Sequence, residues 1–145
     1  MDIREAERRD LIPLLELYWH LHGNPIPLTD AGVEELWRRI LSDGNHHILL
    51  GFVCGELVSS CVLLIVPNLT HAQRPYALIE NVVTHERHRG RGYATRLLAF
   101  AGELAEKESC YKIMLMTGSK DDAVLGFYER AGYDRHDKTG FIRWL

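Results

Sequence analysis

The stretch Arg89-Gly90-Arg91-Gly92-Tyr93-Ala94-Thr95 lies between a predicted strand and a predicted helix. The first amides of a helix have no acceptor within the helix, and the helix dipole is positive at that end. Glycine has no side chain, so the backbone at Gly90 and Gly92 can approach an anion closely. Four arginines add positive charge around the same turn, namely Arg87, Arg89, Arg91 and Arg96. The stretch therefore predicts a binding site for a pyrophosphate group.

The segments on either side of this stretch have the patterns of a strand and a helix. Apolar and β-branched residues dominate residues 76–84 and predict the strand that leads into the glycines. Leucine and alanine at helical spacing predict a long helix over residues 93–108. A strand over residues 111–116, a helix over residues 121–131 and a closing strand over residues 139–145 are expected to follow.

The part of the chain before this strand predicts a hairpin and two helices. Apolar, β-branched runs over residues 47–53 and 57–66 flank a short glycine turn, which is the pattern of two antiparallel strands. A short strand is expected over residues 3–6, and an amphipathic helix over residues 10–22. A second amphipathic helix follows, with Thr29 or Asp30 as its N-cap.

Length and charge restrict the class of protein. The 145 residues fit one domain, which is expected to span residues 1–145. The 17 basic and 20 acidic residues give a formal charge of -3, whereas a domain that binds nucleic acid normally has a clear basic excess. No apolar run approaches the roughly 20 residues that cross a bilayer, and no leader sequence is recognised. The expected protein is cytoplasmic, with no nucleic-acid partner and no membrane partner.

Neither the cysteines nor the histidines have the spacing of a metal site. Cys54, Cys61 and Cys110 lie in apolar segments without a C-x-x-C pair, which also argues against a disulfide framework. No pair among the eight histidines shares a helix face with two further ligands. No metal is expected, so the functional argument rests on the glycine and arginine stretch.

Two common phosphate-binding motifs do not fit this stretch. A P-loop requires Gly-Lys-Ser/Thr, which is missing, and Gly90-x-Gly92-x-x-Thr95 lacks the third glycine of a dinucleotide fingerprint. The predicted hairpin upstream also disagrees with a Rossmann unit. A basic turn that binds no ligand stays open as the alternative.

Two motifs in the second half of the chain resemble those of the GNAT N-acetyltransferases. Arg89-x-x-Gly92-x-Ala94, preceded by Val82-Val83-Thr84 and followed by Leu97-Leu98, is similar to their acetyl-CoA signature, Q/R-x-x-G-x-G/A. The frame that starts at Arg87 also fits, but only the later frame places the two leucines at the usual spacing. Phe127-Tyr128-Glu129-Arg130-Ala131-Gly132-Tyr133 resembles the second family motif, F-Y-x-x-x-G-F/Y.

Two shorter segments resemble the glucosamine-phosphate N-acetyltransferases within that family. They are Ile79-Glu80-Asn81-Val82-Val83 and Cys110-Tyr111-Lys112-Ile113. The resemblance implies an α/β (α+β) fold, with a mixed, mostly antiparallel sheet of six to seven strands and about four helices on both faces. It also implies a homodimer, by analogy.

The activity that the resemblance implies is direct transfer of acetyl from acetyl-CoA to a primary amine. A small polar metabolite is the preferred acceptor, and an amino sugar phosphate is one candidate. Two alternatives stay open: a sensor module that binds acyl-CoA without catalysis, and an acetyltransferase that acts on protein N-termini or lysines.

The resemblance also gives individual residues a role. The strand around Val82, Val83 and Thr84 should separate from residues 111–116 and pair with the pantetheine arm of acetyl-CoA. The amides from Arg89 to Thr95 should hold the pyrophosphate. The Val83 N–H is expected near the thioester carbonyl, as the donor that stabilises developing negative charge.

Two side chains are candidates for proton transfer. Tyr128 is expected to lie against acetyl-CoA and to protonate the departing thiolate, the alternative being a buried aromatic anchor. Glu80 is the candidate base that takes a proton from the amine, the alternative being a carboxylate that binds substrate or supports the structure. Weaker candidates for the acceptor pocket are Tyr18, Trp19, His22, Asn68, Thr70 and Arg74.

Overall fold

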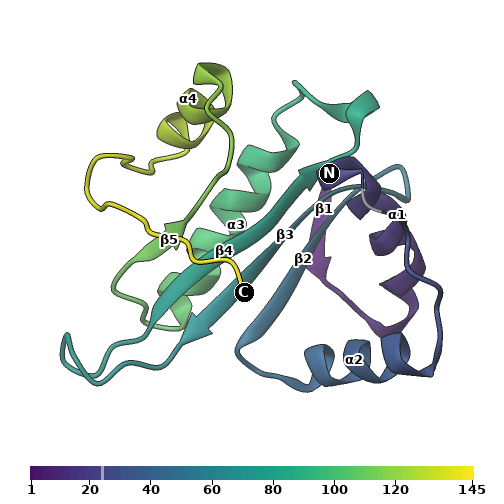
Figure 1. The fold of residues 1–145 in the computed structure, drawn as a ribbon, viewed down its shortest axis with the longest axis horizontal. Coiled ribbons are helices and arrows are strands. Elements are labelled where there is room, and N and C mark those ends of the chain that lie inside the picture. The colour runs from purple at the N-terminus through teal and green to yellow at the C-terminus, as the bar shows by residue number, and fades with distance from the viewer. Residues whose placement is uncertain (24) are drawn as a thin grey trace.

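Five strands form one sheet in the order β1-β2-β3-β4-β5 in the computed structural model, which describes residues 1–23 and 25–145 (Figure 1). The first four strands are antiparallel neighbours, and β5 pairs parallel with β4. The sheet is therefore mixed and mostly antiparallel, as predicted. The strands are β1 (Asp2–Glu5), β2 (His46–Val53), β3 (Glu56–Val66), β4 (Tyr76–Thr84) and β5 (Ile113–Leu115).

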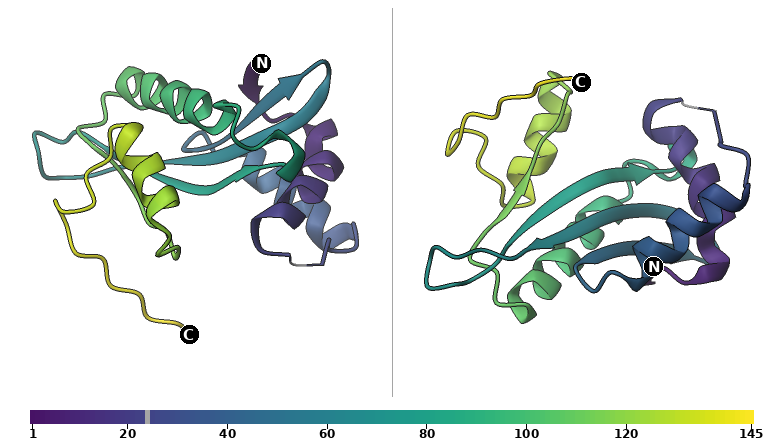
Figure 2. Two further views of the ribbon diagram at one scale, coloured as in Figure 1. Left: turned by 90° about the horizontal axis from the view of Figure 1, so that it is seen from above. Right: turned by 60° about the horizontal axis from the view of Figure 1, so that its bottom comes forward.

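Helices cover both faces of this sheet. α1 and α2 pack on one face, and α3 packs on the other (Figure 2). Short 3-10 turns precede α1 and follow β4, at Arg8–Asp10 and Glu86–His88. The helices of the described ranges are α1 (Leu11–His22), α2 (Ala31–Ser42), α3 (Tyr93–Lys107) and α4 (Asp122–Arg130). This arrangement confirms the α/β fold with about four helices.

Successive side chains along each strand enter two separate apolar clusters. In β2, Leu49 packs in the cluster under α3, whereas Leu50 packs in the cluster under α1 and α2. In β3, Cys61 belongs to the α3 cluster and Val62 to the α1 and α2 cluster. Both clusters lack solvent at their centre, since Leu49 and Leu50 are each 0% exposed. The central strands are apolar on both faces because both faces are covered.

Aspartate caps begin two of the helices. Asp30 accepts a hydrogen bond from the Val33 N–H at 2.9 Å, so Asp30 rather than Thr29 is the N-cap of α2. Asp121 accepts from the Ala123 N–H at 2.8 Å and begins α4 in the same way. Each carboxylate satisfies a free amide and complements the positive end of the helix dipole. α3 begins without such a cap.

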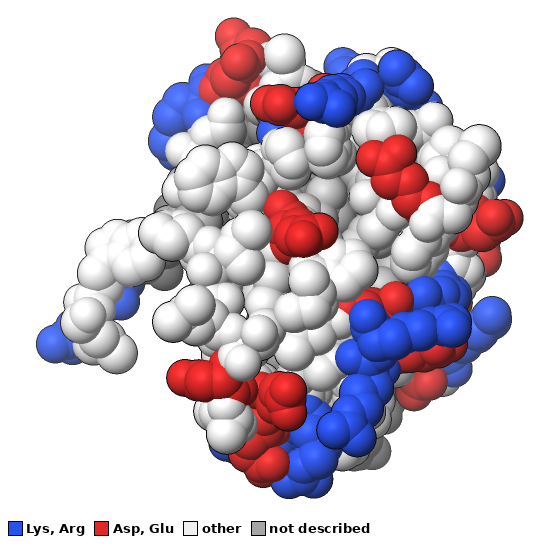
Figure 3. All heavy atoms as spheres, turned by 90° about the vertical axis from the view of Figure 1, so that its right-hand side faces the viewer, with Lys and Arg blue, Asp and Glu red and all other residues white. Residues whose placement is uncertain are grey.

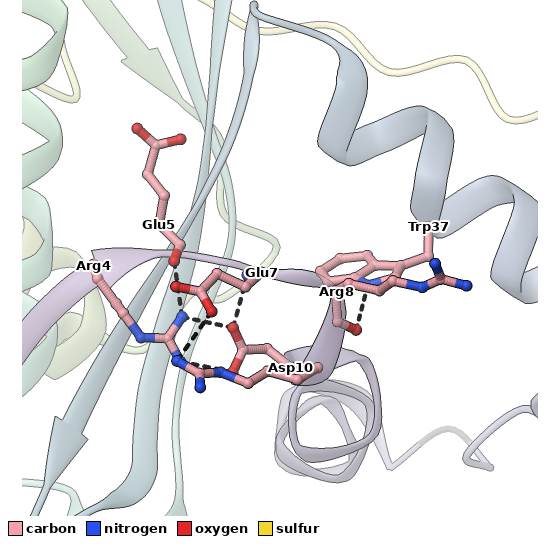
Figure 4. Close-up of polar contacts among 7 residues, drawn as sticks. Arg4, Glu5, Glu7, Arg8, Asp10 and Trp37 are labelled. Atoms are coloured by element: carbon pink, nitrogen blue, oxygen red, sulfur yellow. Dashed lines mark hydrogen bonds and ion pairs between the residues drawn. The ribbon is translucent and has the colours of Figure 1, made fainter.

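A partly buried ion pair connects β1 to the start of α1 (Figure 4). The Arg4 guanidinium donates to both carboxylate oxygens of Asp10, at 2.6 and 2.7 Å, and the Glu7 N–H donates to the same carboxylate at 2.7 Å. The Trp37 indole N–H donates to the Arg8 carbonyl at 3.1 Å and fixes α2 against the same turn. The N-terminal helices are thereby held against the edge of the sheet.

The predicted closing strand over residues 139–145, here called the tail, is wrong. The tail has no secondary structure and makes no backbone hydrogen bond to any described residue, and Phe141 and Trp144 are 90% and 89% exposed. It runs away from the sheet in Figure 2, and an arm of mostly uncharged side chains projects from the body in Figure 3. A strand-forming sequence becomes a strand only when a neighbour supplies backbone partners. The described sheet therefore has five strands rather than six to seven.

Candidate active site

A gap opens in the sheet where β4 and β5 stop pairing. The ladder between them joins Ala77 to Ile113 and ends with Ile79 and Leu115. The second half of β4, from Glu80 to Thr84, keeps β3 as its only neighbour in the described sheet. Its other edge therefore presents unpaired backbone groups, which is where an extended ligand can add as a further strand. This separation agrees with the expected divergence of the two strands.

A β-bulge lies at the same point of β4. Val62 pairs with Glu80 and Ser60 pairs with Val83, so two residues of β4, Asn81 and Val82, stand opposite the single residue Cys61. Asn81 has a φ of +50°, which asparagine tolerates better than most residues. A bulge bends its strand and increases the local twist. The bulge thus turns the end of β4 away from β5.

The hydrogen bonds of β4 determine which amides face the gap. The His85 N–H donates to the Val58 carbonyl at 2.9 Å, so these two residues form a hydrogen-bonded pair. Hydrogen-bonded and non-hydrogen-bonded pairs alternate along an antiparallel ladder. Ser59 and Thr84 are therefore a non-hydrogen-bonded pair, and Ser60 and Val83 are again a hydrogen-bonded pair. The backbone groups of Val83 consequently point toward β3. Those of Thr84, and by alternation those of Val82, point toward the gap.

This orientation corrects the role expected of Val83. Its N–H is turned into the ladder with β3, and its side chain is 3% exposed. The register cannot be read from the sequence, because the bulge inserts one residue and shifts the alternation along β4. Val82 belongs to the bulge, and its carbonyl shares a peptide with the Val83 N–H, so this carbonyl points the opposite way, toward the gap.

The glycine stretch forms a turn that delivers free amides at the start of α3. Gly90 and Gly92 have φ of +73° and +77°, conformations that favour glycine, and Gly92 is the N-cap of α3. A Cβ at either glycine would meet no atom within 4 Å, so the backbone borders open space. The amides of Tyr93, Ala94 and Thr95 have no acceptor among the described residues. This is the geometry of an anion site at a helix N-terminus.

Two of the four arginines hold this turn in place. Arg89 donates to the Thr84 carbonyl at 3.1 Å and to the His20 carbonyl of α1 at 3.0 Å. Arg96 donates to the Met1 carbonyl at 2.9 Å. Their side chains therefore stabilise the turn by binding backbone carbonyls. The sequence predicts positive charge at both positions and an Arg89 amide near the pyrophosphate, but not these contacts with distant carbonyls.

The other two arginines remain available to an anion. Arg87 and Arg91 are exposed, and neither forms an ion pair or a side-chain hydrogen bond with a described residue. Both lie within the turn that precedes α3. Mobile guanidinium groups beside free amides suit a phosphate, which accepts several hydrogen bonds at once.

Two histidine rings, those of His20 and His85, pack together beside the turn. The His20 and His85 rings lie 4.0 Å apart between centroids, and His85 Nδ1 accepts from the Arg87 N–H at 3.2 Å. Burial, followed by the proximity of His20 and His88, lowers the pKa of His85 below its ordinary value. The neutral ring is the form that accepts from the Arg87 amide. A cavity of about 290 Å³ lies beside these rings and is lined by His20, Glu16, Glu56 and His85, with apolar neighbours.

Tyr128 lies in α4 and packs against the apolar cluster under α3. Its ring centroid is 4.8 Å from that of Phe127 and 6.4 Å from that of Tyr133. Burial raises the pKa of Tyr128 above its ordinary value of 10.0, and the proximity of the ionisable groups of Cys61 and Glu80 raises it further. The phenol is therefore fully protonated at neutral pH and available as a proton donor.

Glu80 lies on the other face of the sheet, at the last regular position of β4 before the bulge. It pairs with Val62, which packs under α1 and α2, so the two side chains share that face. The Glu80 side chain is exposed. The sheet therefore separates this carboxylate from Tyr128, which packs in the cluster under α3 on the opposite face.

Tyr18 of α1, a weaker candidate for the acceptor pocket from sequence, lies near Asn81 of the bulge. Burial raises the pKa of Tyr18 to about 12, and the nearby Ser60 and Asn81 side chains offset part of this rise. An aromatic residue at helical spacing is typical of a core position, so the sequence pattern does not predict that Tyr18 lies near Asn81. Trp19 is 50% exposed, and the His22 side chain lies outside the part that the structure describes.

The loop candidates lie at the far end of β4. Asn68 donates to the Thr70 hydroxyl at 2.9 Å and to the Arg74 carbonyl at 3.3 Å, and so closes its own loop. Arg74 donates to the carbonyls of Ser109 and Cys110. This loop precedes Tyr76, whereas the glycine turn follows Thr84 at the opposite end of the strand. The expectation that Asn68, Thr70 and Arg74 border the acceptor is therefore not supported within one chain.

Two further features concern the described ranges only. They contain no group of three His, Cys, Asp or Glu residues that could hold a metal ion. None of their helices is both long enough and apolar enough to cross a membrane.

Comparison with known proteins agrees with this geometry. The sequence profile of the acetyltransferase (GNAT) family matches residues 11–133. The chain is 31% identical over 145 residues to glucosamine 6-phosphate N-acetyltransferase of Trypanosoma brucei brucei, and this match covers 95% of the chain and 92% of the relative.

Solved structures of similar fold extend along the whole chain. One, from Agrobacterium tumefaciens strain C58, to which an acetyltransferase activity is attributed, is 42% identical with a TM-score of 0.92, and the match covers 99% of this chain and 100% of the other. Glucosamine-6-phosphate N-acetyltransferase of Arabidopsis thaliana is 22% identical with a TM-score of 0.86, covering 99% and 97%, which supports the fold alone. Because the profile spans most of the chain and the Trypanosoma relative nearly all of it, the chain belongs to the acetyltransferase (GNAT) family and is an acetyltransferase.

Proposed function

We propose that this acetyltransferase moves acetyl from acetyl-CoA to the primary amine of a small polar metabolite, with an amino sugar phosphate as the first candidate. The observation that carries the proposal is the position of the open β4 edge directly before the uncapped N-terminus of α3. The β4 edge suits an extended amide-containing chain, and the helix N-terminus suits a pyrophosphate. Acetyl-CoA has both parts in this order.

The residues around the glycine turn suit the donor. The amides of Tyr93, Ala94 and Thr95 would bind the pyrophosphate, with Arg87 and Arg91 supplying charge. The backbone groups of Val82 and the Thr84 N–H would pair with the pantetheine amides, while the Thr84 carbonyl keeps its bond from Arg89. When bound, acetyl-CoA supplies an activated acyl group as a thioester.

Three groups around the gap would then serve the transfer. The Val82 N–H replaces that of Val83 as the donor to the oxygen on which negative charge develops. Tyr128 protonates the departing thiolate, for which its raised pKa keeps the proton in place. Glu80 takes a proton from the ammonium form of the acceptor, directly or through water, because an alkyl amine is mostly protonated at pH 7.

The positions of the cysteines support direct transfer, without an acetylated enzyme. Cys61 lies under the bulge, but it is 0% exposed and burial raises its pKa to about 12, so its thiol is protonated and inaccessible. Cys54 is in the β2–β3 hairpin turn, and Cys110 lies next to Tyr111, which bonds to Pro75 just before β4; burial raises the pKa of the Cys110 thiol. The nucleophile is therefore the acceptor amine itself.

The name of the Trypanosoma relative supports the acceptor class. That protein is a glucosamine 6-phosphate N-acetyltransferase, and the match covers nearly all of both chains. We therefore place amino sugar phosphates ahead of peptide N-termini and lysines.

The test is release of thiol from acetyl-CoA with separate amines: glucosamine 6-phosphate, glucosamine, an aminoglycoside and a peptide with a free N-terminus. Mass spectrometry of the product identifies the acetylated amine. The proposal expects turnover with glucosamine 6-phosphate at a higher kcat/KM than with glucosamine. Binding of acetyl-CoA without turnover on any amine would favour a sensor, and turnover on the peptide alone would favour a protein acetyltransferase.

A further inference from the structure

Ser59 of β3 makes a pair of short hydrogen bonds to the end of β4. Its side chain is 0% exposed, and Ser59 Oγ donates to the Val83 carbonyl at 2.8 Å. Ser59 Oγ also lies 2.8 Å from Thr84 Oγ1. A serine hydroxyl has one proton, which Ser59 gives to Val83, so the Thr84 hydroxyl must be the donor in the second bond.

These bonds act on one particular peptide group, the one between Val83 and Thr84. Its carbonyl points toward β3 and receives the Ser59 proton, and its N–H, that of Thr84, points toward the gap. A hydrogen bond accepted by a carbonyl polarises the peptide and strengthens its N–H as a donor. The bond also fixes the plane of the peptide just after the bulge, where the ladder is irregular.

We propose that Ser59 is a positioning residue, which orients and polarises the Thr84 N–H for the pantetheine arm of acetyl-CoA. The inference rests on the proposed function, since it assumes that the open β4 edge holds this arm. Ser59 itself touches no ligand, because it is buried behind β4. Its contribution is to binding, far from the acyl group that reacts.

The neighbouring residue is a matched control. Ser60 is also 0% exposed in β3, but its hydroxyl lies near the Tyr18 phenol of α1 and makes no hydrogen bond to β4. The two serines therefore have equal burial and equal size, and they differ in whether the hydroxyl is bonded to β4. A general loss of packing would affect both variants alike.

The experiment compares Ser59→Ala and Ser60→Ala in binding acetyl-CoA and ADP by calorimetry. ADP has the pyrophosphate without the pantetheine arm. Loss of one hydrogen bond predicts that Ser59→Ala weakens acetyl-CoA binding by about five- to tenfold. Its affinity for ADP, and both affinities of Ser60→Ala, should equal those of the wild type.

Steady-state kinetics supply a second measurement. Ser59→Ala should raise KM for acetyl-CoA with kcat unchanged, which is the pattern of a lost binding interaction that does not change in the transition state. If Ser59→Ala does not fold, Ser59→Cys keeps the volume with a weaker donor, and the same increase in KM is expected. Thr84→Val keeps the bond from Ser59 to Val83, so its effect should be smaller.

The possible results separate the two proposals. Equal acetyl-CoA affinity in the Ser59 and Ser60 variants overturns the role of Ser59, and so does an equal loss of ADP and acetyl-CoA binding in Ser59→Ala. A wild-type protein that binds ADP as tightly as acetyl-CoA overturns the assumption about the β4 edge instead.

Discussion

Glu80 and Tyr128 lie on opposite faces of the sheet, and Glu80 stands where β4 loses its pairing with β5. Glu80 shares its face with Val62 under α1 and α2, whereas Tyr128 packs in the cluster under α3. An amine that enters from the Glu80 side would thus attack toward a thiol that leaves on the Tyr128 side. The two proton transfers would take place at separate ends of one reaction path, and each can be tested by itself.

Tyr128→Phe should lower kcat about 100-fold with acetyl-CoA affinity nearly unchanged, because general acid catalysis contributes on the order of 10²- to 10⁴-fold. Tyr133→Phe is the matched control, since Tyr133 is a half-buried neighbour whose pKa burial raises to about 12. An acid must be protonated to act, and the pKa of Tyr128 is raised above 10.0. The wild-type kcat should therefore not fall between pH 7 and 9.5 through loss of the Tyr128 proton. Equal turnover of the two variants would exclude Tyr128 as the acid.

Glu80→Gln separates a base from a binding carboxylate. If Glu80 is the base, kcat at pH 7 should fall by roughly 10- to 100-fold, and the loss should shrink at higher pH as the free amine deprotonates. KM for the amine should change little. A higher KM with normal kcat would instead show a binding role. Glu103→Gln, on the exposed side of α3, controls for the loss of one charge.

Gly92→Ala should weaken acetyl-CoA binding by about tenfold, because alanine at φ of +77° costs roughly 1–2 kcal/mol and shifts the free amides of α3. Gly132→Ala is the control, since Gly132 has φ of +96° and also borders open space after α4. Both variants should lose a similar free energy of unfolding, but only the first should lose affinity. Unchanged acetyl-CoA affinity in Gly92→Ala would contradict the pyrophosphate site.

Arg4→Met should lower the free energy of unfolding at pH 7 by about 2 kcal/mol, since it leaves a buried carboxylate without its charged partner. The Arg4 hydrogen bonds hold the pKa of Asp10 below its ordinary value of 3.8. A lowered pKa adds stability above the unfolded-state value and loses it as the pH falls through the folded-state value. The difference between variant and wild type in urea should therefore be full at pH 7 and reduced at pH 3. Arg9→Met breaks an exposed pair with Glu7 and should cost at most about 0.5 kcal/mol.

Removal of the tail should weaken self-association. The tail is strand-forming and apolar, and β5 has a free outer edge in the described sheet, so the tail of one copy can pair with the edge of another. We expect the full chain to sediment as a dimer at micromolar concentration and the chain without residues 139–145 as a monomer. Replacing Phe141 and Trp144 by serine, at unchanged length, should give the same shift. Monomers of the full chain at all concentrations would contradict this expectation.

The sequence predicted those parts of the fold that depend on local pattern. The glycine turn and α3 follow from neighbouring residues, because Gly90 and Gly92 adopt positive φ and the leucines after them repeat at helical spacing. The hairpin of β2 and β3 follows from apolar runs around a glycine turn. In both cases the residues of one short segment predict the secondary structure of that segment.

The parts that the sequence did not predict depend on partners distant along the chain. Which of Val82 and Val83 faces the gap depends on a bulge and on a bond from His85 to Val58. The function of Arg89 depends on the His20 carbonyl, which is 69 residues away. The tail has strand-forming residues but no neighbour. Periodicity reports the preference of a segment and carries no information about its partner.

The two bonds of Arg89 also bear on how this protein could change during evolution. Both acceptors, at Thr84 and His20, are main-chain carbonyls, so the guanidinium does not depend on which side chains occupy those positions. Mutations on α1 can therefore alter the surface near the proposed amine substrate while the turn before α3 keeps its shape. A lineage could in this way exchange one amine for another without rebuilding the part that recognises the donor.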